Sequence, residues 1–117
     1  MVASEIESLL KEYGYHITVR DIVENTLSGD RVRSRILHAI NQKIRSVLII
    51  RIRSDGSTRI RFTMPVDRSL LDTLIWRLED QGFIVDIVEG NIDIIKRVNI
   101  NDVISALKEL LSIINNI

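Results

Sequence analysis

The chain has 117 residues and a mass of 13.4 kDa, which is the size of one ordinary domain. Its composition, 45% hydrophobic and 27% charged, is that of a soluble globular protein, and no run of about 18 apolar residues offers a membrane span. The 16 basic residues balance the 16 acidic ones, so the chain does not coat nucleic acid through its net charge. It contains no cysteine, which excludes disulfides, thiolate catalysis and zinc sites built on cysteine.

The first ten residues, MVASEIESLL, indicate the compartment. They have an acidic amphipathic pattern, whereas a secretory signal has a basic region followed by an apolar run. We therefore expect a cytoplasmic protein. The many isoleucines, the preference for arginine over lysine and the single proline agree with the residue usage of thermophilic proteins.

Residues 1–46 are predicted to form three helices. A capping box followed by an apolar stripe predicts a helix over residues 5–13. Thr18 and Asp21 signal a second, short helix that ends at the Leu-Ser-Gly break of residues 27–29. Further along, apolar residues at helical spacing predict a third helix with a basic surface: Val32, Ile36, Leu37, Ile40 and Ile44.

Residues 47–64 change to a period of two and are predicted to form a β-hairpin. A three-residue loop, residues 54–56, places Gly56 where the backbone needs a positive φ and matches apolar residues with apolar residues. The matched pairs are Ile50 with Ile60 and Leu48 with Phe62. The same register places Arg51 directly opposite Arg59.

The remainder of the chain predicts a helix, a second hairpin and a last helix. After Pro65, a helix carries a buried stripe of Leu70, Leu71, Leu74, Ile75 and Leu78. Residues 83–98 return to a strand pattern, and a Glu89-Gly90 turn pairs Val85 with Ile94, Ile87 with Ile92 and Asp86 with Asp93. Asn99 then opens a helix with an apolar face.

These elements predict an α+β fold in one domain, residues 1–117. Three amino-terminal helices, residues 1–46, precede a ββαββα unit with an antiparallel sheet. Residues 66–117 complete the sheet and the core, and the two helices of this unit lie on one face of the sheet.

Four arginines of the 47–64 hairpin form a ladder: Arg51, Arg53, Arg59 and Arg61. Like charges directly opposite each other destabilise an antiparallel pair by about a few tenths of a kcal/mol or more, so the ladder requires an anion. One source is internal, because Asp86, Glu89 and Asp93 belong to a hairpin of the same sheet. The other source is a bound partner.

The order of a short helix, a break, a basic helix and a basic hairpin resembles a winged helix-turn-helix. The resemblance implies a small non-enzymatic, regulatory protein that binds double-stranded DNA, with the hairpin 47–64 as the wing. It implies DNA contacts from Arg31, Arg33, Arg35 and His38 of the helix and from Arg51, Arg53, Arg59 and Arg61 of the hairpin. A single-strand or RNA site is a minor alternative, because only Phe62 could stack bases and its register turns it inward.

The rival hypothesis is a protein-interaction or assembly subunit, with a homodimer as the expected oligomer. Trp76 lies opposite the apolar stripe of its own helix, and the outer sheet face carries Ile49, Ile84 and Ile95 among its charges. We expect the amino-terminal helices to cover this tryptophan. If the acids of the second hairpin neutralise the arginine ladder, the assembly hypothesis is favoured. If the ladder and the third helix form one continuous basic surface, DNA binding is favoured.

No cofactor, metal or catalytic site is expected. His16 and His38 lie on different predicted elements. A metal-dependent nuclease is a minor alternative, because Asp86, Asp93 and Lys96 could bind a divalent ion and assist phosphodiester cleavage. Nucleases of the restriction-endonuclease type place the acid two residues before the lysine. Here the separation is three, which sends Asp93 and Lys96 to opposite faces of a regular strand.

Overall fold

The computed structural model describes residues 2–116, without the side chain of Leu70, and contains three α-helices, two short 3-10 helices and six strands. The first half comprises α1 (Val2–Glu12), β1 (His16–Asn25), β2 (Arg31–Asn41), β3 (Ser46–Arg53) and β4 (Ser57–Pro65). The second half comprises the short 3-10 helix η1 (Arg68–Leu70), α2 (Leu71–Asp80), β5 (Ile84–Val88), β6 (Asn91–Asn99), η2 (Ile100–Asp102) and α3 (Val103–Asn115).

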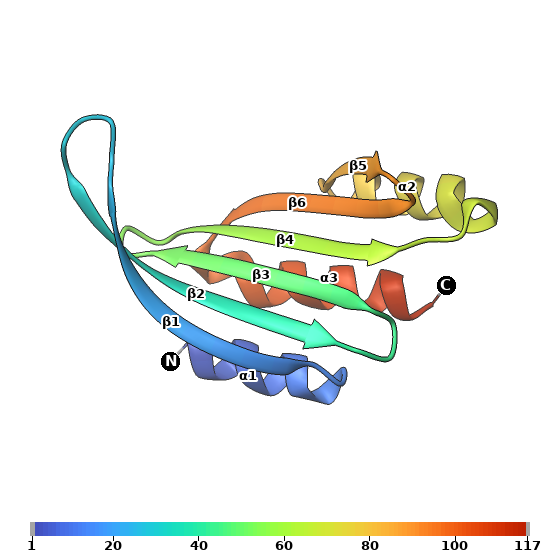
Figure 1. Cartoon of the computed structure of the whole chain (residues 1–117), viewed down its shortest axis with the longest axis horizontal. Helices are drawn as coiled ribbons and strands as arrows, with labels where there is room; N and C mark the ends of the chain where they lie inside the picture. Colours follow the sequence, from blue (N-terminus) through green and yellow to red (C-terminus); the bar gives the residue numbers. More distant parts are fainter. Residues whose placement is uncertain (1, 117) are drawn as a thin grey trace.

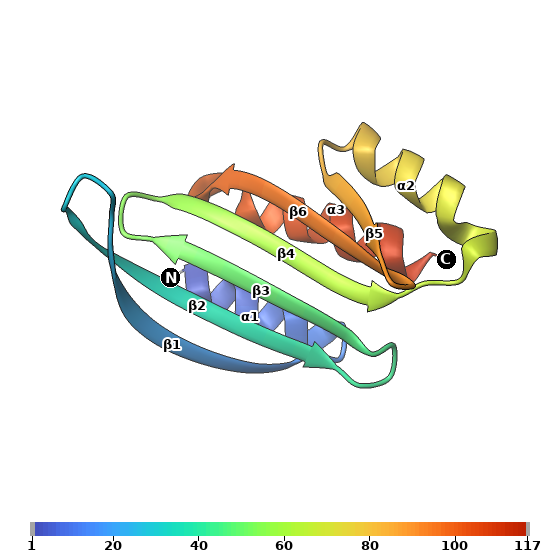
Figure 2. The ribbon, with the colours of Figure 1, turned by 45° about the horizontal axis from the view of Figure 1, so that its top comes forward.

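All six strands form one antiparallel sheet in the order β1-β2-β3-β4-β6-β5. Helices α1 and α3 lie against one face of this sheet (Figure 1 and Figure 2), and α2 packs against β5 and α3 at the end of the same layer. Within residues 2–116, no helix covers the opposite face, which we call the open face. No helix in this part of the chain has the length and apolarity needed to cross a membrane.

The core lies between the sheet and its helices. Alternate strand residues point into it, and the central strands contribute Leu48, Ile50, Ile60 and Phe62, none of which has exposed surface. The helices close the core from the other side through Ile6, Leu10, Leu78, Leu107 and Leu110, which are also fully buried. Because every second residue of a strand faces the helices, the residues between them are presented on the open face.

The prediction of three amino-terminal helices is wrong after the first helix. The segments predicted as the second and third helices form β1 and β2, which pair along ten positions, from His16 opposite Ile40 to Asn25 opposite Arg31. Strand β2 also pairs with β3, so it is an interior strand with neighbours on both sides. The predicted winged helix-turn-helix, with its basic recognition helix, is therefore not formed.

The physical reason is that β2 buries residues on both faces. Leu37 faces the helices and is fully buried, while its neighbour Ile36 is on the open face and is still only 7% exposed. Consecutive buried residues break the alternation expected of a strand and imitate helical spacing. The Leu-Ser-Gly break, predicted to separate two helices, is the turn of the β1–β2 hairpin instead.

The two later hairpins have the predicted registers. Ile50 pairs with Ile60, Leu48 with Phe62 and Arg51 with Arg59, and Gly56 has a φ of 91° in the turn. In the second hairpin Val85 pairs with Ile94, Ile87 with Ile92 and Asp86 with Asp93. The predicted four-stranded sheet is nevertheless too small, because β1 and β2 extend it to six strands. The predicted buried stripe on α2 is confirmed for Leu74 and Leu78, which are buried. The side chain of Leu70, another predicted member of the stripe, lies outside the described part of the chain.

The β1–β2 hairpin projects beyond the rest of the sheet (Figure 1). Its last two pairs, Glu24 with Val32 and Asn25 with Arg31, lie past the last pair that β2 makes with β3. The Thr26 amide donates to the Asp30 carbonyl at 2.8 Å, and the Thr26 hydroxyl oxygen accepts from the Asp30 amide at 3.1 Å. These hydrogen bonds give the projecting turn a defined shape.

Candidate functional site

Three arginines are aligned across neighbouring strands of the open face. Arg51 on β3 lies directly opposite Arg59 on β4, and Arg59 lies directly opposite Arg97 on β6. We call Arg51, Arg59 and Arg97 the arginine row. Arg20 on β1 continues the same line beyond Ile36. Two further arginines flank the row along the strands, Arg53 on β3 and Arg61 on β4.

Part of this positive charge is neutralised within the chain. The Arg61 guanidinium donates two hydrogen bonds to the Asp93 carboxylate, at 3.1 and 3.2 Å. Glu24 on β1 is shared, because its carboxylate lies 3.3 Å from Nη1 of Arg51 and 3.9 Å from Nε of Arg53. Of the three predicted internal acids, only Asp93 forms an ion pair with the ladder in the part of the chain that the structure describes.

Arg59 and Arg97 have no acidic partner among residues 2–116. None of the ion pairs among residues 2–116 includes either side chain. Burial lowers the pKa of the Arg59 guanidinium, and the positive charges of the neighbouring arginines, Arg51, Arg61, Arg97 and Arg53, lower it further. A guanidinium nevertheless stays protonated in a protein, so the charge has to be tolerated or met by an anion from outside.

Arg51 is also incompletely satisfied. Its Nε atom is buried and has no hydrogen-bond partner within the described residues, although its Nη1 reaches Glu24. A buried polar group without a partner costs stability. The arginine row therefore combines mutual repulsion between cations with a buried, unsatisfied donor. An anion placed over the row would relieve the repulsion.

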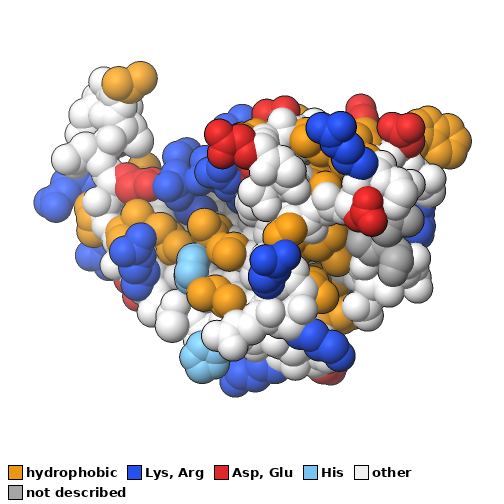
Figure 3. All heavy atoms as spheres, turned by 45° about the vertical axis from the view of Figure 1, so that its right-hand side comes forward, with side chains coloured by type: hydrophobic (Ala, Val, Ile, Leu, Met, Phe, Trp, Pro, Cys, Tyr) orange, Lys and Arg blue, Asp and Glu red, His pale blue; other side chains and the backbone are white. Residues whose placement is uncertain are grey.

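The arginine row separates two adjoining hollows on the open face, and Arg51 and Arg59 line both of them. The smaller hollow, about 210 Å³, also contains Arg53 and Arg97 in its wall. The larger, about 520 Å³, extends across β2 to β1 and is completed by His38 on β2 and Arg20 on β1. In Figure 3 one group of Lys and Arg side chains lies in a depression beside the projecting hairpin, with hydrophobic side chains next to it.

The basic residues predicted for a recognition helix lie on the other side of the sheet. Residues 31, 33 and 35 alternate with the open-face residues of β2, so they share a face with the buried Leu37. Arg35 donates two hydrogen bonds to Asp21, at 2.8 and 3.3 Å, and the pKa of Asp21 is lowered chiefly by this contact. The predicted continuous basic surface of Arg31, Arg33 and Arg35 with the hairpin ladder is therefore not formed, whereas His38 does face the ladder side.

The predicted partner residues are only partly brought together. Ile49, Ile95 and Ile84 lie in one line across the open face, with Arg61 between the first two. Trp76 is 77% exposed on α2, a helix that packs against α3 and β5. The prediction that amino-terminal helices cover this tryptophan is wrong, because α1 packs on the sheet next to α3 and the other two predicted helices are strands.

The residues of the nuclease alternative are not assembled. Asp86 and Asp93 lie opposite each other on β5 and β6, as the register predicts. Lys96 points to the helical side, where its Nζ donates to the Gln81 carbonyl at 2.8 Å and lies 4.8 Å from the centre of the Phe83 ring. Within residues 2–116, no group of three or more His, Asp or Glu side chains is arranged to hold a metal ion.

Three residues of the site were missed in the sequence: Arg20, Glu24 and Arg97. Arg97 could have been found, because it follows Asp93 by four residues and therefore shares its face of β6. Arg20 and Glu24 could not be assigned to this face of the sheet, because their segment is predicted to be a helix.

The chain matches no protein-family model, no curated protein and no solved structure. A function therefore has to be sought in the chemistry of the site itself.

Proposed function

We propose that this chain is a small non-enzymatic protein that binds double-stranded DNA through its open face, with the arginine row against the phosphate backbone. The observation that carries the proposal is the alignment of Arg51, Arg59 and Arg97, of which two have no acid within residues 2–116. Guanidinium groups form paired, charge-assisted hydrogen bonds with phosphate. A bound backbone would supply the anions that the chain lacks.

The length of the row favours a polyanion over a single small anion. Neighbouring strands are about 4.8 Å apart, so three aligned arginines extend over about 10 Å. Arg20 lies two strands further along the same line. One phosphate ion would satisfy only part of such a row, whereas a nucleic-acid backbone presents a series of phosphates.

The side chains of the open face favour contact with the backbone over recognition of bases. The only aromatic residue on β3 and β4 is Phe62, which is fully buried on the helical side. Proteins that bind single strands stack bases on exposed aromatic rings, and the arginine row has none beside it on these strands. A six-stranded sheet is also too broad for a groove of the duplex, so we expect binding with little dependence on base sequence.

The proposal is tested with a fluorescently labelled duplex of random sequence, titrated with protein at low salt. The Arg59→Gln/Arg97→Gln variant should bind at least about tenfold more weakly, because charge-assisted hydrogen bonds contribute about 1.5–3 kcal/mol each. The matched control is Arg68→Gln/Arg77→Gln, which removes the same charge from exposed positions on η1 and α2. Absence of binding by the folded wild type, or equal weakening in both variants, would refute the proposal.

A second candidate function, homodimeric assembly, is favoured by the far end of the sheet. Strand β5 is an edge strand, and its Ile84 and Val88 are 70% and 49% exposed. Exposed apolar residues on a free sheet edge promote pairing with another chain. Trp76 adds a large exposed apolar surface on the helix that packs against this strand.

Assembly through β5 predicts a dimer whose stability depends on Ile84. The Ile84→Lys variant should be monomeric in sedimentation equilibrium at concentrations at which the wild type is dimeric, because a charge would be buried at the contact. Leu27→Lys is the control, since Leu27 is fully exposed on the projecting hairpin at the other edge of the sheet. A monomeric wild type, or a dimer that Ile84→Lys leaves intact, would exclude this assembly.

A further inference from the structure

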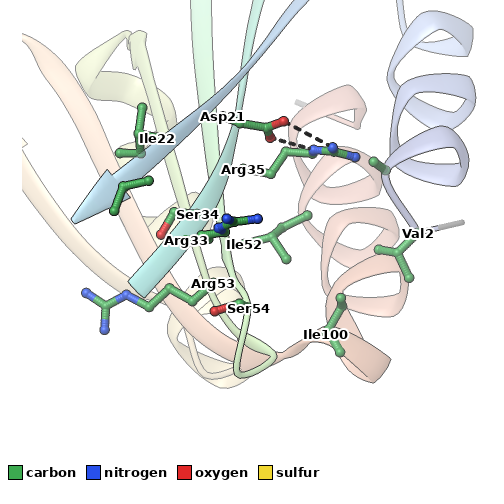
Figure 4. A pocket seen from close by; sticks show the side chains of 12 residues that line it. Val2, Asp21, Ile22, Arg33, Ser34, Arg35, Ile52, Arg53, Ser54 and Ile100 are labelled. Carbon is green, nitrogen blue, oxygen red and sulfur yellow. Dashed lines mark hydrogen bonds and ion pairs between the residues drawn. The ribbon is translucent and has the colours of Figure 1, made fainter. Parts of the chain in front are cut away.

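A third hollow lies on the helical side, at the base of the projecting hairpin. It has a volume of about 590 Å³ and opens between β1, β2 and the start of α1. Figure 4 shows the side chains that surround it, with Val2 and Ile100 on one side and the strand residues on the other. Here the sheet extends past the end of the helical layer, so its inner face is left without a helix to cover it.

The walls of this hollow are mainly apolar. Ile52 forms part of the floor and is 9% exposed, whereas Val23, at the hairpin side, is 52% exposed. Val2 and Ile100, both half-buried, contribute from α1 and η2. Sites for small organic ligands typically have volumes of about 300–1,000 Å³ and mostly apolar walls with a few polar groups, and this hollow fits that description.

Among residues 2–116, the polar groups at the hollow include one cation, Arg33, that forms no ion pair. Arg35 is neutralised by Asp21, to which it donates from Nε at 2.8 Å and from Nη2 at 3.3 Å. Arg33 extends from the neighbouring position on the same face, and no ion pair among residues 2–116 includes it. Arg53 also borders the hollow, but its side chain points away from Val2 and Ile100 (Figure 4).

We propose that this hollow binds a small anionic amphipath, namely a monocarboxylate with a hydrocarbon chain of medium length. Its carboxylate would accept hydrogen bonds from Arg33 and from the Nη1 of Arg35, which the Asp21 contact leaves unused. Residues two apart on a strand are separated by about 7 Å, so the two guanidinium groups can approach one carboxylate from both sides. The hydrocarbon chain would cover Val23, Ile52 and the residues opposite them.

The charge of the ligand follows from the charge balance of the hollow. Arg33 is exposed beside the hollow, so a neutral hydrocarbon would cover the apolar wall but gain no contact with this charge. A polyanion would bring further negative charges toward Asp21 and toward the apolar wall. A ligand with one negative charge and an apolar body therefore matches this hollow, where Arg33 is the cation that forms no ion pair within residues 2–116 and the wall beside it is apolar.

Titration with sodium decanoate, monitored by the backbone amide signals in an NMR spectrum, tests this proposal. We expect saturable shifts centred on Val23, Arg33 and Ile52, with a Kd below about 1 mM. Acetate carries the same carboxylate without the chain and should cause no saturable shift. Failure of decanoate to shift these signals, or shifts centred on the open face, would overturn the proposal.

Two substitutions separate the roles of charge and chain. Arg33→Gln should weaken decanoate binding about tenfold, and Arg33→Lys should restore part of it, because the charge returns without the planar fork. Val23→Ser alters an exposed position, so the fold tolerates it, and it should also weaken decanoate binding. Arg97→Gln removes an arginine of the open face and should have no effect. If Arg97→Gln weakened decanoate binding as much as Arg33→Gln does, the attraction would be nonspecific and the proposed site would be contradicted.

This site is separable from the proposed DNA interface. Arg33 and Ile52 belong to the helical side of the sheet and the arginine row to the open face, and Arg53 is the one described residue that borders hollows on both sides. Arg33→Gln should leave duplex binding unchanged, and Arg59→Gln/Arg97→Gln should leave decanoate binding unchanged. Failure of one proposal is therefore distinguishable from failure of the other.

Discussion

Replacing Arg59 by glutamate should stabilise the folded chain and at the same time abolish most of its binding to DNA. The new carboxylate would lie directly opposite Arg51 and Arg97. Cross-strand pairs of opposite charge contribute about 0.2–1 kcal/mol each, and the repulsion between the present arginines would be removed as well. We therefore expect the free energy of unfolding, measured by urea denaturation, to rise by about 1 kcal/mol.

The same substitution should lower the affinity for a duplex about a hundredfold. A phosphate contact is lost and a negative charge is placed where the backbone would lie, and juxtaposed like charges cost several kcal/mol at an interface. Higher stability together with weaker binding is the result expected when the charges of a binding surface repel one another in the absence of the ligand.

Arg61→Glu is the control for this prediction, because it makes the same change two residues further along β4. Arg61 is paired with Asp93, so a glutamate there would face an acid and should lower the free energy of unfolding. Opposite effects of the two variants on stability are therefore expected. A loss of stability in Arg59→Glu similar to that in Arg61→Glu would contradict the charge distribution described for the open face.

Replacing Phe62 by alanine should remove a large part of the stability of the fold. The ring is fully buried on a central strand, directly opposite Leu48. Truncation of a buried phenylalanine costs about 3–5 kcal/mol, while whole domains are typically stable by about 5–15 kcal/mol. Urea denaturation should show this loss as a lower midpoint with a similar slope.

Phe62→Leu is the matched variant for the core, since it keeps an apolar side chain and leaves a smaller cavity. It should cost about 1 kcal/mol, or slightly more. A cost below about 1 kcal/mol for Phe62→Ala would mean that the ring is not enclosed, and the register of β3 with β4 would then be wrong.

The sequence predicted those parts of the fold whose signals are local. The β3–β4 and β5–β6 hairpins each combine a glycine at a positive φ with strict alternation, so their registers follow from a few neighbouring residues. The helices α1 and α3 have long apolar stripes, which makes their identity equally local. The predicted start of the first helix at residue 5 is wrong, because α1 begins at Val2.

The β1–β2 hairpin was not predictable in the same way. Thr18 and Asp21 fit a helix cap, yet Asp21 is engaged with Arg35 on the neighbouring strand. Ile36 and Leu37 fit a helical stripe, yet they are buried on opposite faces of an interior strand. Both signals are satisfied by tertiary partners that a local pattern does not reveal, and tertiary context overrides weak local preferences.

The candidate site was predictable only in part for a related reason. The opposition of Arg51 and Arg59 follows from one hairpin and was predicted. The addition of Arg97 depends on β6 pairing with β4, a contact between strands that a helix separates in the chain. Neutralisation by Glu24 depends on the position of β1, which was interpreted as a helix. Charge balance at the site is therefore a property of the whole sheet.

The most direct test of the account is the salt dependence of duplex binding for the wild type and for Arg59→Gln/Arg97→Gln. The logarithm of the binding constant falls with the logarithm of salt concentration by about 0.9 for each phosphate neutralised. We predict that the double variant lowers the magnitude of this slope by about two, while Arg68→Gln/Arg77→Gln leaves it unchanged. A slope unaffected by the loss of Arg59 and Arg97 would show that the arginine row does not contact the backbone, and the central claim would fail.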